Sequence, residues 1–141
     1  MSRSHRNLTL EYVAQLHRAV HAIGFFIDRR FGPDLTQPEA MILLLLAEHG
    51  SSSINEVHGA FLHRRSTLTS VLDRLEKKSF VSREIDPGDR RSIRISLTRS
   101  GRRLAGDLVR GFEDVTAELP RKVDEKTIEL LGSTAAVFSE H

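Results

Sequence analysis

The sequence predicts a mainly α-helical fold with a minor β component, of the winged helix-turn-helix type. Three observations lead to this prediction. Helical periodicity recurs along most of the chain, residues 81–97 hold two short alternating segments around a turn, and positive charge concentrates in the middle of the sequence. The expected architecture is a helix-turn-helix with a two-strand wing, flanked by N- and C-terminal dimerisation helices.

The chain of 141 residues has the size of a single domain. It contains no cysteine, which excludes disulfides, thiolate zinc sites and thiol-based redox sensing. The basic start, residues 1–6, leads into no secretory apolar segment. The longest apolar run, residues 40–47, is far shorter than the roughly 17–25 residues that cross a bilayer. We therefore expect a cytoplasmic protein without a membrane partner.

The net charge of +2 hides a strong asymmetry along the chain. Residues 50–103 hold 12 Lys and Arg against 6 Asp and Glu, a net of +6, whereas residues 104–141 hold 4 against 8, a net of −4. A local basic patch attracts polyanions by counterion release, whatever the charge elsewhere. The asymmetry favours double-stranded DNA as a partner, and a solvated charged surface is the alternative.

Two helices are predicted before the basic region. The first runs from about residue 10 to residue 30, with apolar residues at alternating three- and four-residue steps (Val13, Leu16, Val20, Ile23, Ile27), and Gly32-Pro33 ends it. Thr36 and Glu39 have the spacing of a capping box at the start of the second helix. The second helix is apolar nearly all round over residues 41–46, which predicts a central position in the core.

The next two helices read as a helix-turn-helix. Ser53 and Glu56 form a second capping-box signature ahead of a short helix over about residues 54–62. In the helix that follows, one face carries Leu68, Val71, Leu72 and Leu75, and the opposite face carries Ser66, Ser70, Asp73 and Lys77. A tight connection and a polar outward face are typical of a helix that reads the DNA major groove.

A hairpin is predicted directly after this helix. Residues 81–85 and 93–97 read as paired strands, and Pro87-Gly88 is the pair that a type II turn requires. The connection is longer than in a minimal hairpin, so Asp89, Arg90 and Arg91 are expected to project as a wing that reaches the minor groove.

Two more helices complete the predicted fold. One begins near Thr98, carries an apolar stripe from Leu104 to Leu119 and ends at Pro120, and the last one follows Asp124. We expect three regions: residues 1–34 and 104–141 as the two parts of a dimerisation region, and residues 35–103 as the winged helix-turn-helix domain. An intramolecular helical subdomain is the alternative. A twofold dimer reads two half-sites and so multiplies affinity and specificity.

Five segments in the right order resemble the MarR family of bacterial transcriptional regulators. They are Leu35-Thr36, Arg65-Ser66-Thr67-Leu68-Thr69, Asp73-Arg74-Leu75-Glu76-Lys77-Lys78, Asp86-Pro87-Gly88-Asp89-Arg90-Arg91 and Leu97-Thr98-Arg99-Ser100-Gly101. The resemblance implies a homodimer on a palindromic operator, often released by a small anionic or phenolic effector. Ser79 departs from the family by replacing the glycine after the reading helix, and Ser70 stands where a long polar or basic side chain is common.

The resemblance and the basic pattern single out candidate DNA-binding residues. Asp89 and Arg91 match the wing pair that the family uses in the minor groove, with the carboxylate expected to orient the guanidinium. Hydroxyls at the start of the reading helix can meet bases or phosphates, or can simply cap the helix. The full candidate set is Arg64, Arg65, Ser66, Thr67, Thr69, Ser70, Arg74, Asp89, Arg90 and Arg91.

A second candidate site lies on the first helix. Tyr12, His17, His21 and Phe25 could line an effector pocket, although solvent-facing imidazoles are the simpler reading. His17 and His21 have a spacing that can hold a metal, but no third ligand is evident, so we expect neither a metal nor another cofactor.

The leading functional hypothesis is a sequence-specific DNA-binding transcriptional regulator: a homodimeric repressor of a palindromic operator, released by a small-molecule effector. The alternative is a winged-helix protein-interaction module without specific DNA binding. We expect no enzyme, because the sequence shows no nucleophile motif, no glycine-rich phosphate loop and no paired carboxylates in an apolar setting.

Overall fold

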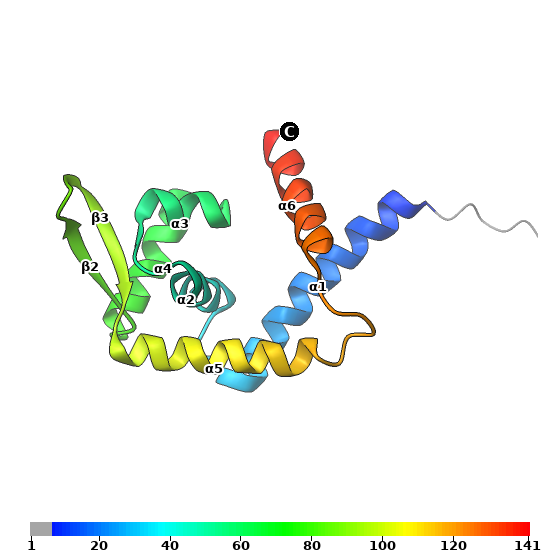
Figure 1. Ribbon diagram of the computed structural model, residues 1–141, viewed down its shortest axis with the longest axis horizontal. Helices are drawn as coiled ribbons and strands as arrows, with labels where there is room; N and C mark the ends of the chain where they lie inside the picture. Colours follow the sequence, from blue (N-terminus) through cyan, green and yellow to red (C-terminus); the bar gives the residue numbers. More distant parts are fainter. Residues whose placement is uncertain (1–6) are drawn as a thin grey trace, which may run out of the picture. The chain divides into compact units, whose positions relative to one another are not determined.

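The computed structural model describes residues 7–141, which divide into one unit ending at Ala40 and a second unit of residues 41–141. The basic residues 1–6, and with them the start of the expected region 1–34, lie outside the described part. The elements in chain order are α1 (Leu8–Phe31), α2 (Gln37–His49), β1 (Ser52–Ser53), α3 (Ile54–Phe61), α4 (Arg65–Lys77), β2 (Val81–Asp86), β3 (Asp89–Leu97), α5 (Arg99–Thr116) and α6 (Glu125–Glu140) (Figure 1). This order confirms the mainly α-helical winged helix-turn-helix fold.

The first unit contains α1 and the start of α2. Asn7 caps α1 by accepting a hydrogen bond from the Leu10 N–H at 3.2 Å, and Gly32, at φ 85°, ends the helix as predicted. The Thr36–Glu39 capping box is confirmed: each residue accepts the backbone N–H of the other, at 3.4 and 3.3 Å. On the apolar stripe of α1, Ile27 is buried, but Val13 and Val20 remain 40% and 53% exposed.

The core of the second unit is built around the apolar faces of α2 and α4. In α2, Ile42, Leu43 and Leu46 are buried, in line with the predicted central position. All four apolar residues predicted on one face of α4, Leu68, Val71, Leu72 and Leu75, are at most 3% exposed. Val57 of α3, Ile95 of β3 and Leu108 of α5 are fully buried. The structure therefore confirms which face of α4 the apolar periodicity predicted to be buried.

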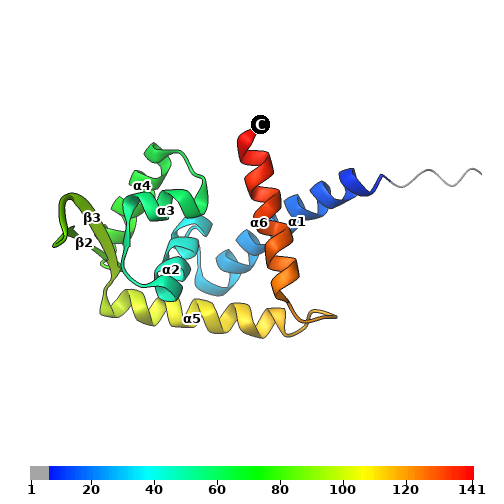
Figure 2. The ribbon, with the colours of Figure 1, turned by 45° about the horizontal axis from the view of Figure 1, so that its top comes forward.

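The predicted helix-turn-helix is formed by α3 and α4 (Figure 2). Ser53 Oγ accepts the Glu56 N–H at 3.1 Å, and the Glu56 carboxylate accepts the Ser53 N–H at 2.6 Å, so both arms of the capping box are present. Those hydrogen bonds favour the charged carboxylate, and the backbone bond from Ser53 is the main reason why the pKa of Glu56 lies below its usual value. Leu62, in the left-handed region at φ 53°, ends α3.

The sheet has three strands in the order β1-β3-β2, not the two that the sequence predicted. Ser52 and Ser53 pair antiparallel with Ile95 and Arg94. A two-residue strand is too short to show alternation, so periodicity could not reveal it. Figure 1 shows β2 and β3 as a projecting hairpin, the wing.

The predicted wing connection is wrong in two respects. The strands are joined by just two residues, Pro87 and Gly88, and Gly88 does not have the positive φ that a type II turn requires. Instead, Asp86 Oδ1 accepts the Gly88 N–H at 2.9 Å. Because Ile85 pairs with Ile93 while Asp86 pairs with Asp89, residues 90–92 form a bulge within β3. The two wing arginines therefore belong to a bulged strand.

The two C-terminal helices differ in how much they bury. The buried positions of α5 are Gly101, Ala105, Leu108 and Gly111. The helix ends at Thr116 and not at the predicted Pro120, so Leu119 lies outside it. No residue of α6 is buried, and its apolar residues Ile128 and Phe138 are 61% and 65% exposed. None of the helices within residues 7–141 combines the length and apolar character that a membrane crossing requires.

Ser79 keeps the left-handed exit that the family glycine usually provides. It sits at φ 63°, its N–H donates to Glu76 O, and the next N–H, from Phe80, donates to Leu75 O, each at 2.9 Å. This pair of bonds is a Schellman motif, whose left-handed position strains any residue with a Cβ.

We expect Ser79→Gly to raise the free energy of unfolding by about 0.5–1 kcal/mol, because relief of strain exceeds the extra chain entropy of glycine. Chemical denaturation at constant m-value measures the change. The matched control is Ser82→Gly in the extended strand β2, where glycine should destabilise by a similar amount. Equal losses in both variants would contradict the strain at Ser79.

Candidate nucleic-acid interface

The polar face of α4 is open to solvent along its whole length. Ser66, Thr67, Thr69, Ser70 and Arg74 are all exposed. The N-cap position is occupied by Arg64, whose side chain makes no capping hydrogen bond. The alternative that a hydroxyl caps this helix is therefore not realised. The N-terminus of α4 has no hydrogen bond from the side chain of its N-cap residue, and uncapped N–H groups at a helix start suit a phosphate oxygen.

Some of these side chains are held by neighbours on the same helix. Thr69 Oγ1 donates to the Arg65 carbonyl oxygen at 2.9 Å, and Arg74 Nη1 donates to Ser70 Oγ at 3.0 Å. The family often has a longer side chain at the position of Ser70. Here the short serine side chain is hydrogen-bonded to Arg74. The Ser70–Arg74 pair presents a guanidinium one turn further along α4.

The wing arginines, Arg90 and Arg91, are exposed in the β3 bulge. Asp89 Oδ1 accepts the backbone N–H of Arg91 at 3.0 Å. The carboxylate was expected to orient the guanidinium, but the bond it makes instead fixes the backbone of the bulge. Asp89 thereby sets the direction in which Arg91 leaves the strand.

The start of the reading helix and the wing line one common hollow, which we call the wing groove. Its volume is about 370 Å³, and Arg65, Asp89 and Arg91 contribute to its wall. The remaining lining residues are Ile54, Asn55, Ser92 and Ile93. Asn55 Oδ1 accepts a hydrogen bond from Arg65 Nη2 at 3.5 Å, so α3 helps to position this arginine. Asn55 was not predicted as a site residue.

Arg83 joins the wing to the reading helix. Its Nη2 lies 2.6 Å from Asp73 Oδ1 and its Nε lies 3.3 Å from Glu76 Oε2, so one strand residue bridges two carboxylates of α4. Sequence reasoning missed this role. Alternate residues share a face of a strand, so the burial of Val81 against the core could have indicated that Arg83 also faces α4.

Arg94 joins the base of the wing to the segment before α3. Its Nε donates to Ser51 Oγ at 2.9 Å, its Nη2 donates to the Ser51 carbonyl oxygen, and its Nη1 lies 3.4 Å from Asp86 Oδ2. The pKa of Asp86 lies below its usual value, first because of the Gly88 N–H and then because of Arg94. Ser51 and Arg94 are 43 residues apart, beyond the reach of local patterns.

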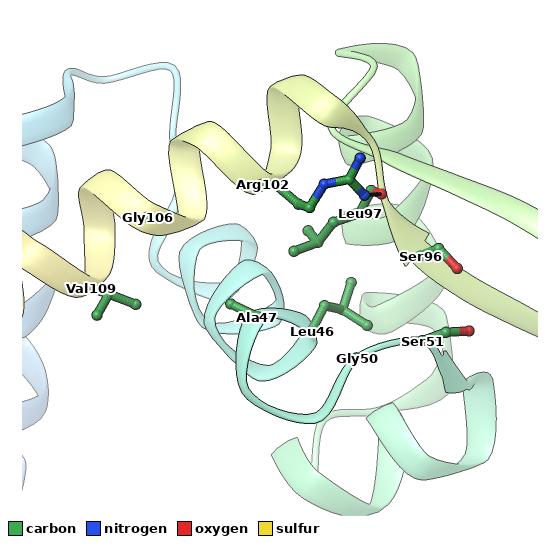
Figure 3. A pocket seen from close by; sticks show the side chains of 9 residues that line it. All are labelled: Leu46, Ala47, Gly50, Ser51, Ser96, Leu97, Arg102, Gly106 and Val109. Carbon is green, nitrogen blue, oxygen red and sulfur yellow. Dashed lines mark hydrogen bonds between the residues drawn. The ribbon is translucent and has the colours of Figure 1, made fainter.

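The predicted effector residues all lie on α1, in the first unit. Tyr12 is half-buried, whereas His17, His21 and Phe25 are exposed. The second unit contains a hollow of about 570 Å³, the α2–α5 pocket, which includes none of these four residues (Figure 3). It is lined by Leu46, Ala47, Gly50, Ser51, Ser96, Leu97, Arg102, Gly106 and Val109. Arg102 Nη1 donates to the Leu97 carbonyl oxygen at 2.9 Å, which places a guanidinium at the pocket wall.

A solvent-facing recognition helix beside an arginine-bearing hairpin defines the class of winged helix-turn-helix regulators. The MarR family model matches residues 35–93. The HTH-type transcriptional regulator YsmB of Bacillus subtilis (strain 168) is 32% identical over 105 residues, which cover 71% of this chain and 72% of YsmB. The chain belongs to the MarR family of HTH-type transcriptional regulators, a family of DNA-binding proteins that are not enzymes.

Two further comparisons agree with this membership. The HTH-type transcriptional repressor NicR of Pseudomonas putida is 32% identical over 95 residues, covering 67% of this chain and 57% of NicR. The structure is also similar to that of Bordetella bronchiseptica BpsR, whose DNA binding is regulated by 6-hydroxynicotinic acid. That match has a TM-score of 0.68 at 22% identity and covers 100% of this chain and 98% of BpsR, so it supports the fold.

Proposed function

We propose that this chain is a homodimeric, cytoplasmic repressor that binds a palindromic operator and is released by a small effector. The observation that carries the proposal is the wing groove, where Arg65 at the start of α4 and Arg91 on the wing line one surface. This arrangement can follow a DNA strand from the major groove into the adjacent minor groove.

Each candidate residue has a distinct proposed role on DNA. Ser66, Thr67, Thr69 and Ser70 face the base edges, while Arg64, Arg65 and Arg74 contact phosphates on either side. Arg91 enters the minor groove, with Asp89 fixing its backbone and Arg90 contacting phosphate. A narrow A·T-rich groove has an enhanced negative potential, which favours arginine at that position.

The exposed apolar stripes support a dimer. Residues 1–34 and 104–141 are proposed to form the dimerisation region around the domain of residues 35–103. Within it, α6 exposes Ile128, Leu131 and Phe138 by 61%, 44% and 65%, and α1 exposes Val20 by 53%. Apolar stripes of this size on two helices are typical of an uncovered interaction surface. A second copy would cover them and would supply the second half-site reader.

The α2–α5 pocket is the proposed effector site in the second unit. Its wall is mainly apolar, with Arg102 as the fixed cation, so a small aromatic or aliphatic anion suits it. The pocket also touches Ser51, which Arg94 links to Asp86 at the end of β2, next to the Pro87–Gly88 turn. An occupant that moves Ser51 would therefore act on the wing. The grouping of Tyr12, His17, His21 and Phe25 stays a sequence prediction.

The proposal predicts a steep salt dependence of DNA binding. Genomic fragments selected by the purified chain should contain an inverted repeat, and the affinity for that site should fall with salt with a slope of roughly −0.9 per neutralised phosphate. Light scattering on the free protein should give a mass twice that of the 15.9 kDa chain. Titrating benzoate into the complex, with Arg102→Ala as control, tests the effector site.

A different set of results would favour the interaction module. A chain that stays monomeric and binds every fragment equally, with no salt slope, is not an operator-binding repressor. Release of DNA by benzoate to the same extent from the Arg102→Ala variant would leave the repressor role intact but would remove the α2–α5 pocket as its effector site.

A further inference from the structure

His17 and His21 lie one turn apart on the exposed surface of α1, and their rings are close together, with an angle of 57° between the ring planes. The two Nε2 atoms are 3.1 Å apart, and the ring centroids are 4.4 Å apart. The sequence alone, which shows no third ligand, predicted no metal here; from the distance between the two nitrogens we propose that this imidazole pair is a bidentate binding site for a divalent transition-metal ion, with copper(II) as the preferred ion.

The distance between the two nitrogens matches the separation of two ligand atoms bound to the same metal ion. An imidazole nitrogen binds zinc at about 2.0–2.1 Å. Two ligands at that distance, subtending between 90° and 109° at the metal, are separated by about 2.9–3.4 Å. The observed 3.1 Å falls inside this interval, so the side chains need no large movement to chelate. The same distance also permits an N–H···N hydrogen bond in the metal-free chain.

Two imidazoles select for a particular kind of ion. Imidazole nitrogen suits copper(II), nickel(II) and zinc(II), and the affinity of such a site rises to copper(II) and falls again at zinc(II). Within residues 7–141 no group of three or more His, Cys, Asp or Glu residues forms a metal site. Water would therefore complete the coordination, which favours the tetragonal geometry of copper(II) over a closed zinc tetrahedron.

The pair lies beside the apolar stripe of α1 and not within it. At about 100° per residue, the two histidines sit roughly 100° around the helix from the centre of the stripe that contains Val20. A metal ion bound there would link two successive turns of α1 and hold the helix together. The stripe would stay free for the dimer contact, and the inference does not depend on DNA binding.

Copper(II) titration of the full-length chain tests the site. Calorimetry in a non-coordinating buffer should show one copper(II) per chain, and electron paramagnetic resonance should show two imidazole nitrogens on the metal. We expect His21→Gln to weaken binding at least tenfold. The sharper variant combines His21→Ala with Ala22→His, which keeps the number of imidazoles but moves one of them about 100° around the helix.

The control is His63→Gln, which removes an exposed histidine next to Phe61 and should leave the affinity unchanged. The proposal is overturned if the shifted double variant binds copper(II) as tightly as the original chain. It is also overturned by one metal per two chains, which would indicate a site shared between copies, or by a spectrum with a single nitrogen ligand.

Discussion

Replacing Gly101 with alanine is expected to lower the free energy of unfolding by about 2–3 kcal/mol. A Cβ at this position would lie 1.9 Å from the Phe80 carbonyl oxygen and 2.9 Å from the Phe80 carbonyl carbon. Both atoms belong to the backbone, so α5 or the α4–β2 connection must move. The same junction holds hydrogen bonds from Thr98 Oγ1 and Ser100 Oγ to the Ser79 carbonyl oxygen, at 2.6 and 2.8 Å.

Thermal unfolding at a fixed protein concentration measures this effect, as a drop in Tm of roughly 5–10 °C. The matched control is Gly59→Ala in α3, where a Cβ meets no atom within 4 Å. There the gain in helix propensity, at most about 1 kcal/mol, should raise the stability slightly. An unchanged Tm in Gly101→Ala, with the control behaving as expected, would show that α5 does not begin against Phe80.

Replacing Arg91 with alanine is expected to weaken operator binding by about 10–100-fold. Arg91 is exposed at the bulge of the wing, where its guanidinium can enter the minor groove, and its loss removes one cationic contact. The slope of log affinity against log salt should therefore fall by about 1. Fluorescence anisotropy on the selected operator, over a range of salt concentrations, gives both numbers.

Two comparisons separate a wing contact from a general charge effect. Arg121→Ala removes the same charge from an exposed position between α5 and α6, and should change affinity by less than about twofold. Asp89→Asn keeps an oxygen that can accept the Arg91 N–H, so it should bind nearly as well as the original chain, whereas Asp89→Ala should not. If Arg91→Ala and Arg121→Ala lose affinity equally, the wing has no specific role.

The helices could be predicted because their signals are local. Capping residues such as Ser53 and Glu56 fix where a helix starts, and apolar spacing fixes which face of α4 is buried. The open polar face of the reading helix follows from the same periodicity. The candidate residues of α4 were therefore placed correctly on the exposed surface, while their roles on DNA stay predictions.

The features that were missed depend on contacts between distant segments. β1 exists because residues 52 and 53 pair with β3, and Arg94 reaches Ser51 across 43 residues. The wing bulge is a matter of register between two strands, which a turn motif such as Pro87-Gly88 does not specify. The early end of α5 at Thr116 leaves the apolar Leu119 outside the helix, so continued apolar spacing was misleading there.

The two arginine links of the wing have a mechanical consequence. Arg83 of β2 pairs with Asp73 of α4, and Arg94 of β3 is hydrogen-bonded to Ser51, ahead of α3. A wing held at two points resists deformation, so when the protein binds it is the DNA duplex that must bend. The energy of bending DNA depends on its sequence and is lowest at pyrimidine–purine steps. Base pairs that no side chain touches would then contribute to the choice of operator.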